Sequence, residues 1–256
     1  MTNFYLQAII IYVCLIGFIY LFFRTKKTTA VVDTCWSLGH WVIGLWLLSY
    51  NTNQTIYNTL TFVALSLWAF RLSGYVYFTR VYNTKHVEKR YDELLKKQGQ
   101  SFHRQFLKQI ILQVTMIYVL MAPFYFSLYL PLQIHPILGI TCGIIFLFGW
   151  INEAYTDWQR HQFRKSNTGI LQKGWWQLSR HPNYFFELVM WFSFATIAIT
   201  QPFGLIAFIS PLLLLILMLK ITIPVTETYA LKNNPKAYKN YQHSTSKLVP
   251  LFKRSN

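Results

Sequence analysis

The chain has 256 residues, 54% of them hydrophobic, and a formal net charge of +16 from 24 Lys and Arg against 8 Asp and Glu. Clustered cations can bind nucleic acid, but these cations flank apolar stretches, so membrane topology accounts for them and we expect no nucleic-acid partner. The three cysteines form no CxxC motif and no Cys/His pair with metal-ligand spacing, so we expect no metal site.

Seven apolar stretches follow one another along the chain, and each is a candidate membrane helix. They lie at residues 4–23, 36–50, 59–77, 106–128, 137–151, 184–199 and 203–225. The expected fold is therefore an all-α integral membrane bundle of about seven transmembrane helices, in which residues 1–256 form a single multi-pass domain. Its expected surroundings are the lipid bilayer, and its oligomeric state is left open.

The charged residues predict the orientation in the membrane. The segments without Lys, Arg, Asp or Glu are 1–3, 51–57, 129–136 and 200–202. The segments that collect the cations are 24–27, 80–108, 153–180 and the stretch from residue 220 onward. Short loops rich in Lys and Arg stay in the cytoplasm, so we expect the amino terminus outside and the carboxyl terminus in the cytosol of a cell membrane, the inner membrane if the source is bacterial.

Polar residues interrupt the second and third apolar stretches. The residues that share a helical face are Asp33, Trp36 and His40 on the second stretch, and Trp68, Arg71 and Tyr75 on the third. Ionisable groups at membrane depth need a partner or a wet cavity. Two interpretations therefore stay open: an Asp33 to Arg71 ion pair that joins the two helices, or a pocket that the same residues also line.

The stretch from Thr79 to Gln105 is too long for a simple connection between two helices. Its middle has an amphipathic helical pattern, with Tyr91, Leu94 and Leu95 on one side. The pattern fits an interfacial helix held by lipid headgroups, and it fits equally a cap over a cytosolic pocket.

A second polar region begins on the fifth apolar stretch. Glu153, Asp157, His161 and Arg164 recur at steps of three or four residues, so one helical face carries both acids and bases. A solvated face is the alternative interpretation. The polar stripe leads, however, into a denser cluster that extends from Ser179 to Glu187.

The cluster predicts a helix start. Pro182 suits the first turn of a helix, where its missing N–H donor has no consequence. The free backbone donors and the positive dipole end of such a start suit phosphate groups. Downstream, Asn183, Glu187 and Trp191 are four residues apart and share one face, and Glu187 needs a partner or a wet cavity at membrane depth.

At these residues the chain resembles the steroid 5-alpha-reductase C-terminal superfamily, especially its bacterial multi-pass branch of mostly uncharacterised function. The strongest correspondence is SRHPNYFFELVMW, Ser179 to Trp191. In addition, LWAFRLSGY is similar to the family's Arg-containing third span, VEKRYDEL to its inner-loop Arg-Tyr motif, and the tail from Tyr241 to Pro250 to its terminal segment.

The resemblance implies a membrane oxidoreductase that uses NADPH to reduce an activated carbon–carbon double bond in a lipid, whether steroid-like, prenyl or fatty. It implies that the cofactor-binding half is about 150–256 and that the active site faces the cytoplasm. The cofactor contacts that it implies are Arg71, Tyr75, Arg80, Glu153, Asp157, Arg164, Asn183, Tyr184, Glu187 and Trp191. Arg180 and His181 join this set because cations just before a helix start can hold phosphate. No GxG occurs among the eleven glycines, which argues against a Rossmann domain.

The catalytic acid does not carry over from the resemblance. Animal steroid reductases have a Gln-Glu pair on the second span and a catalytic Tyr before the third-span Arg, where this chain has Asp33-Thr34 and Trp68. By location we expect Asp33 to donate the proton, with Tyr75 and Tyr91 as alternatives. A carboxylic acid in an apolar site can stay protonated near neutral pH and donate a hydrogen bond, as in ketosteroid isomerase.

Two other functions compete with the reductase. An S-adenosylmethionine-dependent membrane methyltransferase of the isoprenylcysteine or phospholipid type shares the Arg-His-Pro-x-Tyr start and a similar tail. Its glycine soon after that tyrosine is absent here, and its adjacent Glu-Glu pair is reduced to Glu227. The pairing of Asn183 with Glu187 favours the reductase. The third possibility is a non-catalytic lipid-binding or transport protein, although the inverted repeats and broken helices typical of carriers are not evident.

Overall fold

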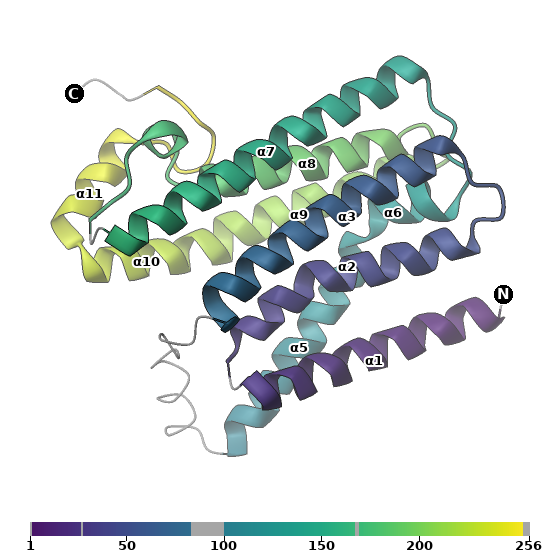
Figure 1. Cartoon of the computed structure of the whole chain (residues 1–256), viewed down its shortest axis with the longest axis horizontal. Coiled ribbons are helices and arrows are strands. Elements are labelled where there is room, and N and C mark those ends of the chain that lie inside the picture. Colours follow the sequence, from purple (N-terminus) through teal and green to yellow (C-terminus); the bar gives the residue numbers. More distant parts are fainter. Residues whose placement is uncertain (1, 27, 83–99, 167–168, 253–256) are drawn as a thin grey trace. The chain divides into compact units, whose positions relative to one another are not determined.

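The computed structural model describes residues 2–26, 28–82, 100–166 and 169–252. These residues are helical for the most part and contain no β-strand, which confirms the all-α prediction. The chain divides into two compact units, Met1–Leu132 and Gln133–Asn256 (Figure 1). The second unit contains the whole of the predicted cofactor-binding half. The prediction of a single domain stays a prediction.

The first unit is built around α2, which packs against α1, α3 and α5. Its elements are α1 (Thr2–Lys26), α2 (Ala30–Tyr50), α3 (Ile56–Val76), η1 (Tyr77–Tyr82), α5 (Gln100–Leu120), α6 (Ala122–Phe124) and η3 (Tyr125–Tyr129). Apolar side chains from the end of α1 and from the first parts of α2 and α5, including Phe23, Val31 and Phe106, form one core cluster. Asn58, buried at the start of α3, donates its amide to the carbonyls of Ser127 and Leu130 at 2.8 Å and so ties α3 to η3.

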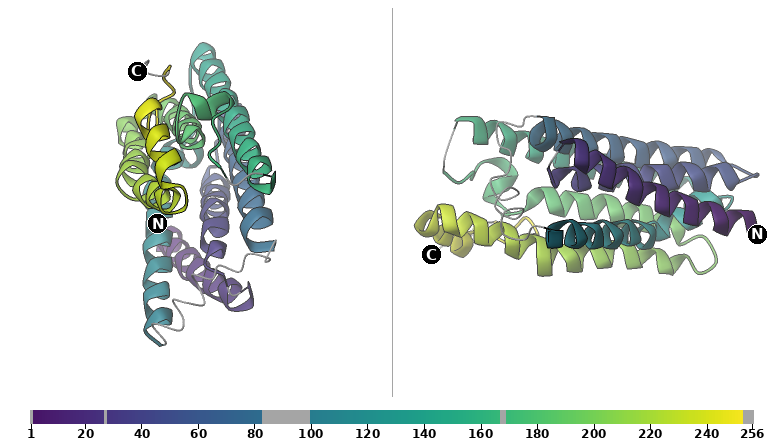
Figure 2. Two further views of the ribbon diagram at one scale, coloured as in Figure 1. Left: turned by 90° about the vertical axis from the view of Figure 1, so that its left-hand side faces the viewer. Right: turned by 90° about the horizontal axis from the view of Figure 1, so that it is seen from below.

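The second unit is organised by the long helix α7 and its neighbour α8, which lie side by side along their length (Figure 2). Its elements are α7 (Pro136–Ser166), η4 (Gly174–Gln177), α8 (Pro182–Ala198), η5 (Gly204–Phe208), α9 (Ile209–Leu217), η6 (Met218–Thr222), α10 (Ile223–Asn233) and α11 (Pro235–Ser244). The run from η5 to α10 packs against α8 through η5 and α9, and α11 folds back beside α10.

Five described helices are long and apolar enough to cross a membrane, and a sixth span results if the pair Ser101–Leu120 and Ala122–Tyr129, bent by 41°, counts as one. The five are Asn3–Lys26, Ala30–Tyr50, Ile56–Tyr82, Pro136–Lys165 and Gly204–Asn233. The multi-pass character is therefore confirmed. The remaining predicted span is α8, whose 17 residues reach about 26 Å against a hydrocarbon core of about 30 Å. The count of seven stays a prediction, as does the orientation of the termini.

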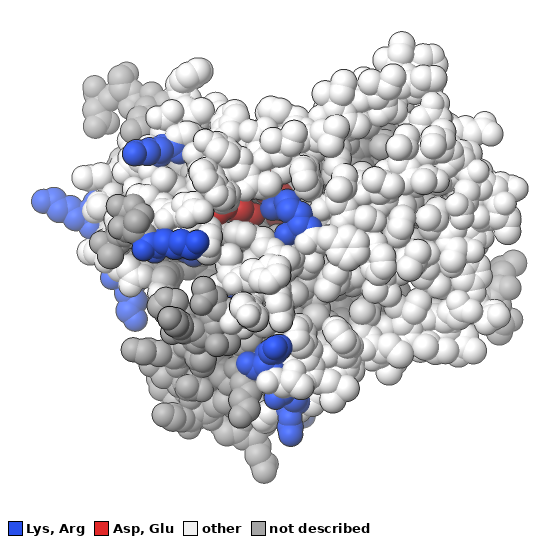
Figure 3. All heavy atoms as spheres, in the orientation of Figure 1, with Lys and Arg blue, Asp and Glu red and all other residues white. Residues whose placement is uncertain are grey.

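Charge is distributed unevenly along the second unit. On the face shown in Figure 3, the surface over the first half of α7 is free of charged side chains, whereas Lys and Arg are visible at the end with α10 and α11. The first half of α7 exposes Ile137, Ile140 and Ile144, whereas its last turn carries Arg164 and Lys165. This helix therefore combines a lipid-compatible half with a polar half.

Candidate functional site

Two acids are buried on the polar half of α7. Glu153 is 2% exposed and Asp157, one turn later, is 5% exposed. Farther along the same helix face, His161 is half-buried and Arg164 is exposed. The exposure of the predicted polar face therefore increases toward the end of α7. A merely solvated face would expose the first turns as well. Buried carboxylates need hydrogen-bond or charge partners, so these two acids mark a polar position within the second unit.

The first turn of α8 meets Asp157. Pro182 occupies the first helical position, as predicted, and His181 is the N-cap residue. Asn183, 8% exposed, donates its amide Nδ2 to Asp157 Oδ1 over 3.3 Å. Within the described part of the chain, its Oδ1 is buried and accepts no hydrogen bond. An acceptor in this position is suited to a ligand hydroxyl or amide N–H.

The loop ahead of α8 is anchored to α7 by two tryptophans of η4. Trp175 donates its indole N–H to Asn152 Oδ1 at 2.8 Å, and Trp176 donates to the carbonyl of Thr156 at 3.2 Å. The Arg160 guanidinium lies 5.6 Å from the centre of the Trp176 ring. These contacts hold the loop beside the two buried acids.

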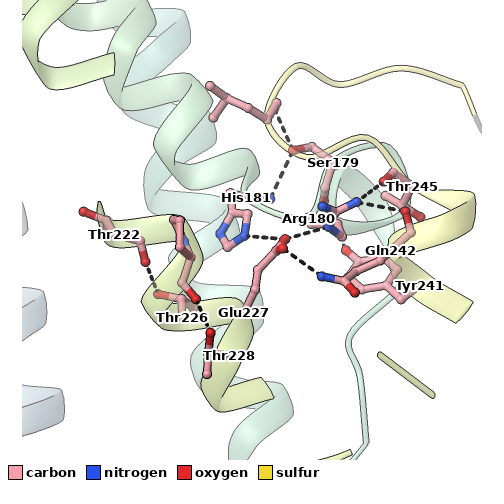
Figure 4. Close-up of polar contacts among 12 residues, drawn as sticks. Ser179, Arg180, His181, Thr222, Thr226, Glu227, Thr228, Tyr241, Gln242 and Thr245 are labelled. Atoms are coloured by element: carbon pink, nitrogen blue, oxygen red, sulfur yellow. Dashed lines mark hydrogen bonds and ion pairs between the residues drawn. The ribbon is translucent and has the colours of Figure 1, made fainter. Parts of the chain in front are cut away.

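Arg180 and His181, predicted to bind phosphate, both turn toward Glu227 of α10 (Figure 4). The Nε atom of Arg180 donates to Glu227 Oε1 at 2.7 Å, and His181 Nε2 lies 3.2 Å from the same oxygen. Burial lowers the pKa of His181, and the nearby Arg160 and Arg180 lower it further. Together these effects outweigh the hydrogen bond to Glu227 and the charge of Glu227, which raise it.

The carboxyl-terminal tail pairs with the same loop. Arg180 N–H donates to the carbonyl of Ser246 at 2.8 Å, and Ser179 Oγ donates to the carbonyl of Leu248 at 2.7 Å. The Tyr241 hydroxyl donates to the carbonyl of Trp176 and, over 3.1 Å, to that of Ser179. Sequence reasoning identified the tail as a family-like segment but gave no indication of these partners, and it treated Glu227 only as the remnant of a Glu-Glu pair.

The other predicted residues of α8 follow from its helical register. Tyr184 stacks on His181, with ring centres 5.3 Å apart and planes 6° apart. Glu187 is half-buried, and Trp191 is fully buried. The predicted shared face of Asn183, Glu187 and Trp191 is therefore helical and faces inward for the most part.

In the first unit, Asp33 lies in surroundings different from the apolar site that we expected. It forms an ion pair with Arg80 of η1, 3.0 Å from Oδ2 to Nη1, and the two side chains are 49% and 52% exposed. The expectation of an apolar environment for Asp33 is therefore corrected, because α3 continues into η1 and brings Arg80 beside it. Arg71 and Tyr75 are half-buried on α3, and Tyr91 lies outside the described residues. The proton-donor roles stay predictions.

The predicted faces of α2 and α3 nevertheless meet. His40 packs edge-on against Trp68, with ring centres 5.4 Å apart, and both side chains are fully buried. His40 Nδ1 also lies 2.8 Å from the carbonyl of Trp36, one turn earlier. His40 from the predicted face of α2 and Trp68 from the predicted face of α3 therefore lie in contact in the first unit.

The second unit thus brings together two polar groups: the buried cluster of Glu153, Asp157 and Asn183, and the charged cluster of Arg180, His181 and Glu227. Neither a curated protein nor a solved structure matches the chain. Residues 19–245 match the family described as "Protein of unknown function (DUF1295)". Because the match covers most of the chain, this protein belongs to the DUF1295 family.

Proposed function

We propose that the protein is a membrane oxidoreductase that uses NADPH to reduce an activated carbon–carbon double bond of a lipid, as its resemblance to the steroid 5-alpha-reductase C-terminal superfamily suggests. The observation that carries the proposal is the buried cluster at the start of α8. Asn183 there presents a buried acceptor with no described partner, beside the carboxylate of Asp157 and one turn from Glu153.

The chemistry of this cluster fits a nicotinamide dinucleotide. Carboxylate and amide oxygens accept hydrogen bonds from ribose hydroxyls and from a carboxamide. The start of the 17-residue helix α8 supplies free N–H donors and a positive dipole end for phosphate groups. Arg164 is exposed at the end of α7 and can form charge-assisted hydrogen bonds to a phosphate. Glu187, Tyr184 and Trp191 extend the proposed contact set along α8.

When bound, the nicotinamide supplies the hydride. The residues of the chain hold and orient the dinucleotide: Glu153, Asp157 and Asn183 through acceptors, and the helix start with Arg164 through donors. Burial of this cluster keeps water away from the contacts and strengthens them. The proton donor for the second step stays a prediction among Asp33, Tyr75 and Tyr91. The Arg80 guanidinium, 3.0 Å from the Asp33 carboxylate, favours the ionised form of that acid, so the two tyrosines are the preferred donors.

A lipid substrate agrees with the apolar character of the first unit. A groove of about 470 Å³ runs between α1 and α5, and its lining is almost wholly apolar, with Ile16, Gly17 and Leu107 as walls. Tyr20, His103 and Arg104 complete its lining. Such a groove suits an acyl, prenyl or steroid skeleton, and all three classes remain within the proposal.

The methyltransferase is the second candidate, because the Arg180-His181-Pro182-x-Tyr184 start is common to both types. Against it, the one acid near the last helix already accepts hydrogen bonds from within the protein. Glu227 Oε1 accepts from Arg180, and its Oε2 accepts from Gln242 at 2.8 Å. We therefore rank S-adenosylmethionine below NADPH as the ligand.

The proposal is tested by titrating NADPH into the full-length protein purified in detergent. Saturable binding is expected, together with a loss of about tenfold or more in Arg164→Ala, because a charge-assisted hydrogen bond contributes about 1.5–3 kcal/mol. Lys165→Ala is the matched control, since it removes a neighbouring exposed cation outside the proposed contact set.

The alternatives give different results in the same titration. Saturable binding of S-adenosylmethionine without NADPH would establish the methyltransferase instead. Failure to bind either ligand, in protein that elutes as a single folded species, would favour a non-catalytic lipid-binding role. Equal effects of Arg164→Ala and Lys165→Ala would remove Arg164 from the site.

A further inference from the structure

The guanidinium of Arg180 is used inside the protein. The residue is 8% exposed, and its Nε donates to Glu227 Oε1 at 2.7 Å. Its Nη1 donates to two backbone carbonyls, those of Gln242 at 3.0 Å and Thr245 at 2.6 Å. The Arg180 guanidinium therefore donates three hydrogen bonds to other residues of the protein. Bonds of this number and geometry are suited to holding chain segments in place.

Glu227 is the complementary centre on α10. It is 8% exposed and receives Arg180 and His181 on Oε1 and the amide of Gln242 on Oε2. Figure 4 shows these three side chains converging on its carboxylate from the loop and from α11. A buried charge destabilises a protein unless ion pairs and hydrogen bonds compensate it. Removal of Arg180 or of Glu227 would therefore leave the charge of the other residue buried and uncompensated.

The pair holds the segment from which α8 begins. Arg180 directly precedes His181, the N-cap residue, and Asn183 follows in the first turn. The same loop is held from the tail by the bonds of Ser179 to Leu248 and of Arg180 N–H to Ser246. The orientation of the first turn of α8 therefore depends on contacts with α10, α11 and the tail.

We propose that Arg180 and Glu227 are positioning residues, which place His181 and Asn183 at the start of α8 and do not themselves contact the cofactor. The inference rests on the proposed function, because it assumes that this helix start binds the dinucleotide. It replaces the direct phosphate contact that the position of Arg180 in the sequence suggested.

A positioning role for Arg180 and a direct phosphate contact predict different effects of a substitution at Glu227. If Arg180 bound a phosphate directly, Glu227→Gln would leave its guanidinium charge in place, and NADPH affinity would change little or rise. If the pair positions the helix start, Glu227→Gln and Arg180→Met weaken binding alike, and the double variant is no worse than the weaker-binding single variant. Loss of positioning lowers the affinities for NADPH and NADH by the same factor. Loss of a direct contact with the extra phosphate of NADPH would instead change the ratio of the two affinities.

The experiment uses full-length protein in detergent, at a temperature well below the melting point of every variant. The dissociation constants for NADPH and NADH are measured in the wild type, Glu227→Gln, Arg180→Met and the double variant. Lys239→Met, which removes an exposed cation from α11, is the matched control. We expect a loss of at least tenfold in each single variant, no further loss in the double variant, an unchanged NADPH to NADH ratio, and no effect in the control.

Hydrogen exchange of the amides in residues 179–186 provides a readout that does not need the cofactor. Faster exchange there in both single variants, with unchanged exchange in the middle of α7, is the expected result. If Arg180→Met does not fold, Arg180→Lys takes its place, since it keeps the charge but loses the forked geometry.

The outcomes separate the inference from the proposed function. If the wild type binds no NADPH, the proposed function fails, and positioning of the loop is decided by exchange alone: faster exchange supports it and unchanged exchange overturns it. If the wild type binds NADPH but only the Arg180 variants bind weakly, or if they lose NADPH more than NADH, Arg180 contacts the phosphate and the inference is wrong.

Discussion

His181 joins three roles in one side chain at the start of α8. It is the N-cap residue, it stacks on Tyr184, and its Nε2 lies 3.2 Å from Glu227 Oε1. The imidazole is 2% exposed, and its pKa is lowered by burial and by the cations Arg160 and Arg180. A neutral imidazole that donates Nε2–H to the Glu227 carboxylate is consistent with these surroundings.

We expect His181 to make the folded state sensitive to acid. Because its pKa is lower in the folded than in the unfolded chain, the unfolded chain binds the proton more readily between the lowered pKa and the ordinary value of about 6.5. Its contribution to stability is therefore complete above about pH 6.5 and is lost as the pH falls through this window. His181→Gln, which keeps an N–H donor, should flatten the decline of the melting temperature in acid.

The measurement is a series of melting curves in detergent between about pH 5 and 8, the range in which histidine titrates. His243→Gln is the control, because His243 is an exposed histidine on α11. The idea is wrong if the melting temperatures of His181→Gln and the wild type decline in parallel below about pH 6.5.

At the scale of elements, the close approach of α7 and α8 places the buried acids beside Asn183. The helices meet at Gly149, where an added Cβ would lie 2.8 Å from Met190 Cγ and 2.9 Å from the carbonyl oxygen of Phe186. Farther along, Ser193 Oγ donates to the carbonyl of Cys142 at 2.8 Å. Small residues and hydroxyl bonds of this kind are the usual means by which membrane helices associate closely.

Gly149→Ala is therefore expected to push the two helices apart and to destabilise the protein by about 1–3 kcal/mol, the range for overpacking. Because backbone atoms of α8 are among those in the way, a side-chain rotation cannot relieve the contact fully. The same change at Gly143, on the same helix, meets nothing within 4 Å and should alter stability by no more than about 1 kcal/mol.

Thermal unfolding in detergent compares these two variants with the wild type. A melting temperature for Gly149→Ala equal to that of Gly143→Ala would mean that the helices are not in close contact at this position. A loss confined to Gly149→Ala would support the packing that brings Asp157 and Asn183 together.

At the scale of the whole molecule, the membrane topology depends on α8. Five described helices meet the length and hydropathy expected of a span and a bent pair adds a sixth, whereas α8 has 17 residues. A helix of that length lies at the lower limit for crossing a bilayer. An odd number of spans puts the termini on opposite sides, so this one helix decides whether the orientation predicted from the charges holds.

We expect Lys173 and Thr200, which flank α8 and are both exposed, to lie on opposite sides of the membrane. Single cysteines at these positions, in a chain whose three native cysteines are replaced by serine, are treated in intact cells with a membrane-impermeant thiol reagent. The cysteine at Thr200 should react in intact cells, and the one at Lys173 only after lysis. Reaction of both, or of neither, before lysis would show that α8 does not cross.

The sequence alone was sufficient to predict most of the helices and the start of α8, because apolar runs, periodicity and the effect of proline on a helix are local properties. It predicted that Glu153 and Asp157 share a face of α7, and the structure adds that this face is buried. It did not predict that α2 begins at Ala30 or that α3 continues through η1, because helix ends depend on contacts as well as on hydropathy.

Only the tertiary structure decided which charges meet. Arg180 and Glu227, and likewise Asp33 and Arg80, are 47 residues apart in the chain, and no local pattern relates them. Spacing along the sequence indicates which residues share one helix face, but the partner of a buried charge is set by how separate helices and the tail pack. For this reason the sequence suggested a phosphate ligand at Arg180, whereas the structure gives its guanidinium Glu227 and the carbonyls of Gln242 and Thr245 as partners.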